Sequence, residues 1–178
     1  MRRIIFINNI FYSYTMNILF VCSGNVFRSM SAEKLAKKCC KDNNLNLTID
    51  SAGTSEHKNY PNKTTMDELK KYVGEFTHKS KHISQQLCDT ASIIICMSPV
   101  HQRYIREHYN KASVLYNELA TGKKVLVQDL DDAYPQTLFM SPLEQLPFFD
   151  KHVPVIVNNI HDTIPTVLKK EQEFSKYQ

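Results

Sequence analysis

Short apolar runs alternate with helical patterns along most of the chain, and this alternation constrains the fold more than any other feature. Residues 17–22, NILFVC, form a continuous apolar run bounded by turn residues, which is typical of a strand buried on both faces of a parallel sheet. From Ser29 onward, apolar positions recur at helical spacing, with charged residues on the other side. Strands that alternate with helices indicate an α/β fold with a parallel sheet. The 178 residues are enough for a single domain with its own core.

The pattern predicts a four-stranded parallel sheet flanked by helices on both faces. Strands are predicted at residues 17–22, 47–50, 92–97 and 124–130. Helices are predicted from Ser29, over 64–73, 82–91 and 98–109, and from Asp150 to Val167. Pro154 is expected near the first turn of this last helix, and Pro165 is expected to bend it. Segment 135–147 is apolar but contains three prolines, and we expect a packed loop there, with a lid as the alternative.

The composition limits the location and the partners of the protein. Residues 1–15 begin with basic and apolar residues, but no small-residue cleavage site follows. We therefore expect an extension or an alternative start before a domain at 16–170 and a tail at 171–178.

Five cysteines without disulfide or zinc spacing indicate a reducing compartment, most simply the cytoplasm, and no metal. A net charge of +4 with scattered lysines argues against nucleic acid as a partner, and no stretch is apolar enough to span a membrane.

A thiol and a guanidinium share one short turn, VCSGNVFRS, at residues 21–29. Cys22 ends the first predicted strand, at the edge of the sheet where α/β proteins bind ligands. Turn amides and the next helix N-terminus would bind an anion there and favour a thiolate. Arg28 offers a planar fork for two phosphoryl oxygens, while Gly24 and Asn25 tolerate unusual backbone angles. The turn is therefore interpreted as a phosphate cradle with a nucleophile, the alternative being a buried cysteine beside an ordinary turn.

Several blocks of the sequence together resemble the low-molecular-weight protein tyrosine phosphatases. FVCSGNVFRSMSAE (20–33) is similar to the phosphate-binding loop of that family and to the helix after it. DSAGTS (50–55), HKSKHI (78–83) with DTASIIICM (89–97), and DDAY (131–134) follow in family order. The resemblance implies a Rossmann-like phosphatase fold, no cofactor, and hydrolysis of phosphotyrosine proteins or small aryl phosphates, with phosphate and vanadate as competitors.

The same resemblance assigns roles to individual residues. Cys22 would be the nucleophile that forms a phosphocysteine, Arg28 would bind the phosphoryl group, and Asp132 would be the general acid and later the base, with Asp131 as a substitute. Ser29 would donate a hydrogen bond to the thiolate, and Ser51 and His78 would support the loop through Asn25. Without the family resemblance, His78 would be interpreted as a surface histidine among lysines. The implied substrate-binding residues are Ser23, Gly24, Asn25, Val26, Phe27, Ser29, His57 and Tyr134.

Four positions depart from the family pattern. Phe27 replaces a cysteine that would trap an oxidised nucleophile as a disulfide, so over-oxidation of Cys22 is expected. Met30 replaces a proline at the helix start, and Ala133 replaces a proline, which should loosen the acid loop. His57 stands where an aromatic residue often forms a substrate wall, which would leave Tyr134 as the aromatic wall. Segment 135–147 is longer than the family needs and has no assigned role.

Three other functions remain open from the sequence. A phosphate- or phosphotyrosine-binding module without catalysis would explain the departures at Phe27, Ala133 and His57, but it would have no use for a general acid. An arsenate reductase coupled to thioredoxin would need two further cysteines near the third strand. Cys96 is roughly in place, but no cysteine follows it in the next loop, and Cys88 precedes the strand. A phosphatase for small phosphomonoesters is the third possibility.

Overall fold

Four parallel strands form the centre of the protein in the computed structural model, which describes residues 16–56 and 60–174. The strands are β1 (Met16–Cys22), β2 (Leu47–Gly53), β3 (Ile93–Cys96) and β4 (Val114–Leu115), in the spatial order β2-β1-β3-β4. β1 pairs with β2 from Met16↔Leu47 to Cys22↔Gly53, and on its other side it pairs with β3. The predicted four-stranded parallel sheet is confirmed, and β1 occupies its interior as the continuous apolar run requires.

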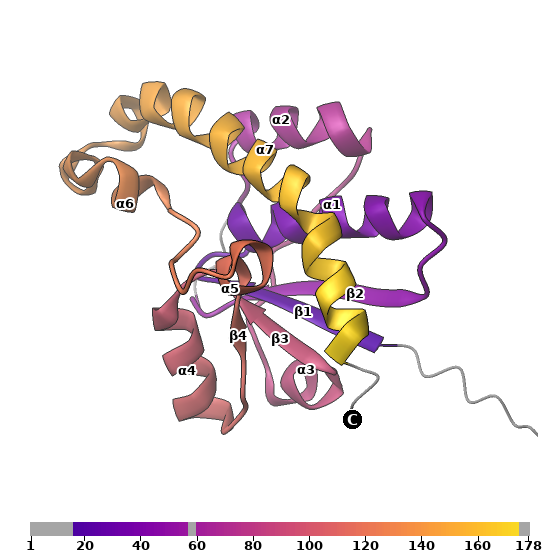
Figure 1. Cartoon of the computed structure of the whole chain (residues 1–178). Helices are drawn as coiled ribbons and strands as arrows, with labels where there is room; N and C mark the ends of the chain where they lie inside the picture. The colour runs from indigo at the N-terminus through magenta and orange to yellow at the C-terminus, as the bar shows by residue number, and fades with distance from the viewer. Residues whose placement is uncertain (1–15, 57–59, 175–178) are drawn as a thin grey trace, which may run out of the picture.

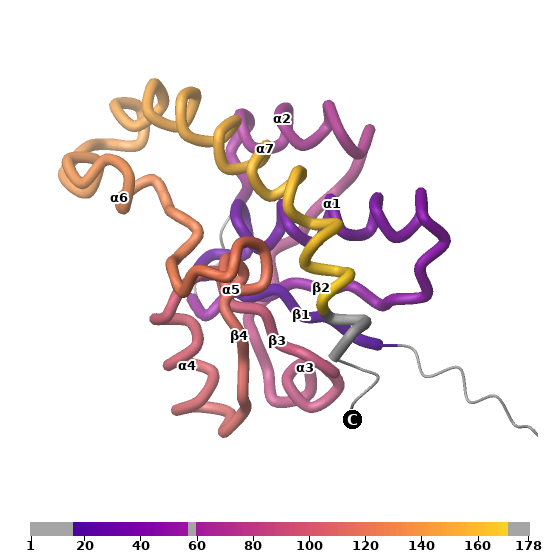
Figure 2. The backbone as a smooth tube through the Cα atoms, viewed as in Figure 1, coloured from indigo at the N-terminus to yellow at the C-terminus, as the bar shows by residue number. Residues whose placement is uncertain are grey.

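Helices cover both faces of the sheet (Figure 1). One face carries α1 (Arg28–Asp42), α2 (Lys63–Val73) and the long α7 (Pro142–Phe174), and the other carries α3 (Gln85–Thr90) and α4 (Pro99–Tyr109). The shorter elements are α5 (Tyr116–Thr121), α6 (Leu130–Ala133) and the 3-10 turn η1 (Pro135–Phe139). Figure 2 traces α7 across the outside of α1 toward the start of β1. No helix among the described residues is long and apolar enough to cross a membrane.

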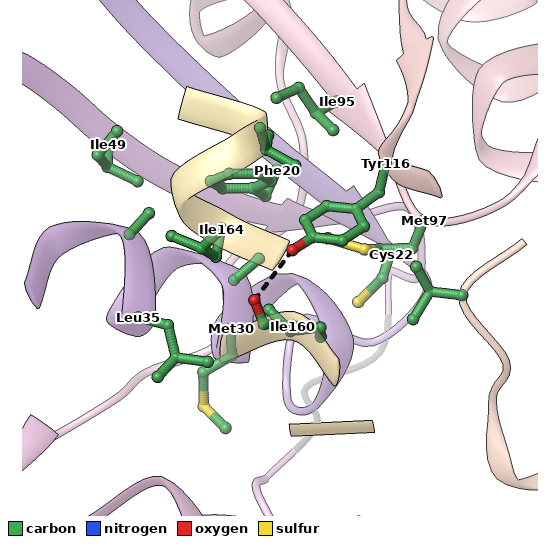
Figure 3. Close-up of a cluster of buried hydrophobic side chains, with 14 of the residues drawn as sticks. Phe20, Cys22, Met30, Leu35, Ile49, Ile95, Met97, Tyr116, Ile160 and Ile164 are labelled. Carbon is green, nitrogen blue, oxygen red and sulfur yellow. Dashed lines mark hydrogen bonds between the residues drawn. The ribbon is translucent and has the colours of Figure 1, made fainter. Parts of the chain in front are cut away.

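The larger hydrophobic core lies between the sheet and α1, α5 and α7 (Figure 3). Phe20 and Tyr116 are almost fully buried in it, with their ring centroids 6.3 Å apart. The Tyr116 hydroxyl donates to the Ile160 carbonyl at 3.2 Å, which gives this buried polar group a partner. Cys22 belongs to the same cluster, so the end of β1 is anchored by the core.

The fourth strand is not where the sequence pattern predicted it. Residues 124–129 form no strand, and β4 is the two-residue element Val114–Leu115. Within 124–130, Val127 and Leu130 are buried and Val125 is half exposed, and the Val127 N–H donates to the Met97 carbonyl at 2.8 Å. The prediction of a strand at 124–130 was therefore wrong, because an apolar run carries no information about the strand with which it would pair.

Segment 135–147 is helical rather than a loop, and the expectation that it is packed was also wrong, because Leu138, Phe139, Leu143 and Leu146 are exposed. It consists of η1 and the first turns of α7, which begins at Pro142 instead of Asp150. Prolines open both elements, where the missing N–H would have no partner in any case. Pro154 lies well inside α7, so the expectation that it falls near the first turn was wrong, and Pro147 is also internal.

Candidate active site

Close contact between β2 and the loop after β1 fixes the position of Cys22. Thr54 donates its N–H to the Cys22 carbonyl, and Ser55 donates its N–H to the Ser23 carbonyl, both at 2.9 Å. A Cβ on Gly53 would lie 2.5 Å from the Ser23 carbonyl oxygen and 3.0 Å from the Asn25 nitrogen. Only glycine therefore allows the end of β2 to approach the loop this closely.

The Cys22 thiol is 3% exposed and receives hydrogen bonds from its own loop. The Asn25 N–H donates to Cys22 Sγ at 3.3 Å, and the Ser29 hydroxyl lies 3.0 Å from the sulfur. Asn25 Nδ2 donates to Ser29 Oγ at 3.1 Å, and the Ser29 hydroxyl lies within reach of two acceptors, the sulfur and the Ala52 carbonyl at 3.4 Å. The loop therefore places one of its own backbone N–H groups and a hydroxyl on the sulfur.

Asn25 holds the loop in a left-handed turn with φ 55° and is completely buried. Its side chain donates to Ser51 Oγ at 2.8 Å and accepts the Lys81 N–H at 3.0 Å, while its carbonyl contacts His78 Nε2 at 2.6 Å. Burial lowers the pKa of His78 below its ordinary value. The structure thus brings Ser29, Ser51 and His78 together around Asn25, as the sequence predicted.

Glu33 extends this network toward the surface. Its carboxylate accepts the Ser51 hydroxyl and the Lys37 ammonium, each at 2.5 Å, although the residue is only 3% exposed. Burial raises the pKa of Glu33, but these two hydrogen bonds and the charges of Lys34 and Lys37 together outweigh it, so the pKa lies below its ordinary value. The sequence alone gave Glu33 no role, because a glutamate beside lysines on a helix usually faces solvent.

Arg28 is 4% exposed and is fixed by the segment that follows α5. Its Nη1 donates to the Val127 carbonyl at 3.2 Å, and its Nη2 forms an ion pair with the Asp129 carboxylate. The side chain of Asp129 is 40% exposed, so this carboxylate also reaches solvent. Arginine and carboxylate therefore lie together at the edge of the loop that holds the thiol.

A cavity of about 350 Å³ opens above this loop. Its floor comprises Cys22, Gly24, Val26, Phe27 and Arg28, and Asp129 lies on one side. The remaining walls come from the segment before α2, from α2 itself and from the first turns of α7: Tyr60, Asn62, Thr65, Pro142, Gln145, Leu146 and Phe149. A cavity with a thiol and an arginine on its floor and apolar walls suits an anionic group carried on an apolar body.

The structure does not bring Asp132 to the thiol. The Asp132 carboxylate accepts the Asp129 N–H at 2.8 Å, while the Asp129 side chain accepts the Leu130 N–H at 3.0 Å. These bonds are part of a capping box that starts α6. Asp132 lines a separate cavity of about 470 Å³ with Asn117, and Asp131 accepts the Thr137 hydroxyl at 2.7 Å. Both carboxylates thus take part in the cap, but Asp129 also pairs with Arg28, and the sequence could not show which of the two lies beside the arginine.

Tyr134 is not a wall of the cavity. Its ring packs against Phe148 and His152, with centroid separations of 5.1 and 5.9 Å. His152 also contacts the Phe27 ring at 6.0 Å, so this aromatic group joins the acid segment to the loop. Tyr60 and Phe149 supply the aromatic walls instead. His57, the other predicted wall, lies outside the described residues.

His101 is a buried group that the sequence did not single out. It lies on α4, with Nε2 2.9 Å from Ser23 Oγ and Nδ1 3.0 Å from Ser98 Oγ. Burial, together with the nearby Arg28 charge, lowers the pKa of His101 to about 3, so the ring is neutral at ordinary pH. His101 therefore connects Ser23 to the start of α4, and no motif in SPVH marks this role.

A parallel α/β sheet with a thiol held among loop donors beside an arginine defines the class of phosphatases that use a cysteine nucleophile. The family model described as low molecular weight phosphotyrosine protein phosphatase matches residues 17–136. The human low molecular weight phosphotyrosine protein phosphatase is 31% identical over 125 residues, which cover 65% of this chain and 79% of the human protein. The chain therefore belongs to the low molecular weight phosphotyrosine protein phosphatase family.

Other relatives show how far the similarity extends. A protein-arginine-phosphatase of Bacillus subtilis is 29% identical over 100 residues, 54% of this chain and 65% of that protein. The crystal structure of a protein tyrosine phosphatase from Entamoeba histolytica matches with a TM-score of 0.70 and 19% identity, covering 90% of this chain and 99% of that chain. At this identity, the structural match establishes the shared fold.

Proposed function

We propose that this protein hydrolyses phosphotyrosine and related aryl phosphomonoesters through a phosphocysteine intermediate on Cys22. The observation that carries the proposal is the buried Cys22 sulfur, which has the Asn25 N–H at 3.3 Å and the Ser29 hydroxyl at 3.0 Å and lies on the floor of a cavity beside Arg28. Loop amides and the Arg28 fork would hold the phosphoryl oxygens and stabilise the charge that develops on them.

The reaction would proceed in two displacements. In the first, the Cys22 thiolate attacks phosphorus, the bond from phosphorus to the phenolic oxygen breaks, and an acid protonates the departing phenolate. In the second, the resulting carboxylate takes a proton from water, the water oxygen attacks phosphorus, and the P–S bond breaks to release phosphate and the thiolate. Ser29, which contacts the sulfur, would stabilise the thiolate as it leaves.

We assign the acid and base role to Asp129 rather than to Asp132. Both carboxylates take part in the α6 cap, but Asp129 lines the cavity that contains Cys22 and contacts Arg28, whereas Asp132 lines a separate cavity. The bound phosphoryl group would compete with Asp129 for Arg28, which would free the carboxylate to take up a proton. Substrate binding would thus prepare the acid.

The cavity favours an aryl group over an alkylguanidinium group. This comparison matters because one relative is a protein-arginine-phosphatase. Val26, Phe27, Tyr60, Leu146 and Phe149 give the cavity apolar walls, and the one carboxylate among its described lining residues already pairs with Arg28. Apolar and aromatic walls suit a phenyl ring, whereas a guanidinium would lose hydration without gaining a free carboxylate.

The other cysteines support hydrolysis over a thiol relay. Cys96 and Cys88 are at most 1% exposed and lie in the smaller core, whereas Cys22 belongs to the larger one. Burial raises the pKa of Cys88 to about 11 and that of Cys96 to about 12, so both stay protonated at neutral pH. All five thiols are free, which is consistent with a cytoplasmic protein.

Hydrolysis of p-nitrophenyl phosphate at mildly acidic pH, with EDTA and reductant, tests the proposal. Turnover is expected in the parent protein, inhibition by phosphate and vanadate is expected, and Cys22→Ser should abolish turnover while still binding phosphate. Arg28→Lys should also fail, because a point charge cannot replace the planar fork. A folded parent that binds phosphate without turning over any aryl phosphate would refute hydrolysis and favour a binding module.

A further inference from the structure

Exposed apolar side chains gather where η1 meets α7. Among the eight large hydrophobic residues that are exposed in the described chain, four lie between positions 138 and 146, and Phe139 and Leu143 are 91% and 79% exposed. We call these four the apolar rim: Leu138, Phe139, Leu143 and Leu146. Figure 1 shows the connection between α6 and α7 projecting away from the sheet. Exposed apolar groups concentrated on one short segment mark an interaction site more often than scattered ones do.

Internal hydrogen bonds hold the rim segment in a defined shape. Gln145 Nε2 donates to the Thr137 and Met140 carbonyls at 3.0 and 3.1 Å. Glu144 accepts the Ser141 N–H at 2.8 Å and the Ser141 hydroxyl at 2.7 Å. These polar groups are satisfied within the segment, so its apolar groups dominate the outer surface. A prearranged surface loses little conformational entropy when a partner binds.

The rim continues directly into the catalytic cavity. Leu146 belongs to the rim and also lines the cavity that contains Cys22, together with Pro142 and Phe149 from the same segment. Tyr60, which is 82% exposed, stands among the other wall residues. A chain whose phosphorylated side chain enters the cavity would therefore pass over this surface.

The chemistry of the segment selects an apolar partner. Residues 135–149 contain one ionisable side chain, Glu144, and its carboxylate is held by Ser141. The family model ends at residue 136, so the rim lies beyond the part of the chain that the family match covers. The surface therefore offers apolar area without a charge to attract basic or acidic sequences.

We propose that the apolar rim binds apolar residues that flank the phosphotyrosine of a protein substrate. The inference rests on the proposed phosphatase function and narrows its substrate class to phosphotyrosine segments with leucine-like or aromatic neighbours. The phosphate loop recognises the phosphoryl group, the cavity walls recognise the ring, and the rim recognises the sequence around it. Small aryl phosphates would use the first two contacts alone.

Two phosphotyrosine peptides of equal length and charge test this proposal. One carries leucine and phenylalanine on both sides of the phosphotyrosine, and the other carries serine and glutamine. The parent is expected to show a kcat/KM about tenfold higher for the apolar peptide, mainly through KM, since burying one such side chain changes affinity by about this factor. The double variant Phe139→Ser, Leu143→Ser should reduce the ratio to near one.

A matched control and a binding assay complete the experiment. Val155 is 62% exposed on α7 outside the rim, so Val155→Ser should keep the preference. The affinity of both peptides for Cys22→Ser, measured by fluorescence polarisation, tests the rim without turnover. If the two peptides bind with equal affinity, the rim inference is overturned even where p-nitrophenyl phosphate is hydrolysed. If the apolar peptide still binds more tightly but no aryl phosphate is hydrolysed, the proposed function alone is overturned. If the parent is a dimer, the double variant Phe139→Ser, Leu143→Ser is a monomer, and the two peptides bind equally well, the rim is instead a surface for self-association.

Discussion

Replacing Asp129 by asparagine should separate catalysis from binding at this site. The substitution preserves the shape of the side chain, removes its proton-transfer capacity and releases Arg28 from its ion pair. A positioned general acid contributes about 10²–10⁴ in rate, or about 3–5 kcal/mol of transition-state stabilisation. For phosphotyrosine, a poor leaving group, kcat should fall by this factor, while KM should stay constant or decrease because Arg28 is free to bind phosphate.

Asp132→Asn is the matched control for this experiment. An asparagine at position 132 keeps an oxygen that can accept the Asp129 N–H, so the α6 cap survives. Its kcat should remain within about twofold of the parent, since surface substitutions that keep their contacts have small effects. Steady-state kinetics over pH would add a second readout, because the alkaline decrease in kcat should disappear in Asp129→Asn alone. A hundredfold loss in Asp132→Asn with little change in Asp129→Asn would refute the assignment and restore Asp132 as the acid.

Three further predictions concern the loop and its supports. Gly53→Ala should lower the free energy of unfolding by about 1–3 kcal/mol and reduce kcat, because its Cβ would lie 2.5 Å from the Ser23 carbonyl oxygen; an unchanged Tm would contradict this close approach. His101 has its pKa lowered to about 3 in the folded state, so the unfolded chain binds more protons below pH 6.5 and stability should fall as pH drops from about 6.5 toward 3. The resulting loss in the free energy of unfolding amounts to about 2 kcal/mol at pH 5. Thermal melts at pH 7 and pH 5 should therefore show a smaller change in Tm for His101→Asn than for the parent. Asn25→Gly should permit the left-handed turn yet lose the bonds to Ser51 and Lys81, so activity should fall at least tenfold while the circular dichroism spectrum stays the same; full activity would show that the backbone angle alone matters.

Local sequence signals were sufficient to bring Cys22 and Arg28 together but not to show which aspartate lies beside Arg28. Cys22 and Arg28 lie six residues apart in a single strand-to-helix turn, so their proximity follows from local geometry. Asp129 reaches Arg28 across 101 residues of sequence, and its orientation depends on which carboxylate starts α6. Three aspartates within four positions give a sequence pattern no means of choosing among them.

The errors in the fold have a related cause. The stretch 124–130 contains an apolar run typical of a strand, yet strand pairing depends on the neighbouring segment, and β3 pairs with Val114–Leu115 instead. In 135–147, prolines suggested irregular structure because their positions relative to helix starts were unknown, whereas Pro135 and Pro142 both begin helical elements. Apolar composition did not predict burial either, since Phe139 and Leu143 are exposed, so burial, strand partners and element boundaries all required the tertiary structure.

The network around Asn25 has a consequence for protein engineering. The loop spans nine residues, but its shape also depends on Ser51, His78 and the Lys81 backbone, and the Gly53 bridge to His82 brings the last segment alongside β2. Residues 21–29 transplanted into another strand–helix turn would therefore lack the supports that orient their amides. The smallest portable unit of this site comprises β1, α1, β2 and residues 78–83, and a scaffold that is to receive the nucleophile must accept all four pieces together.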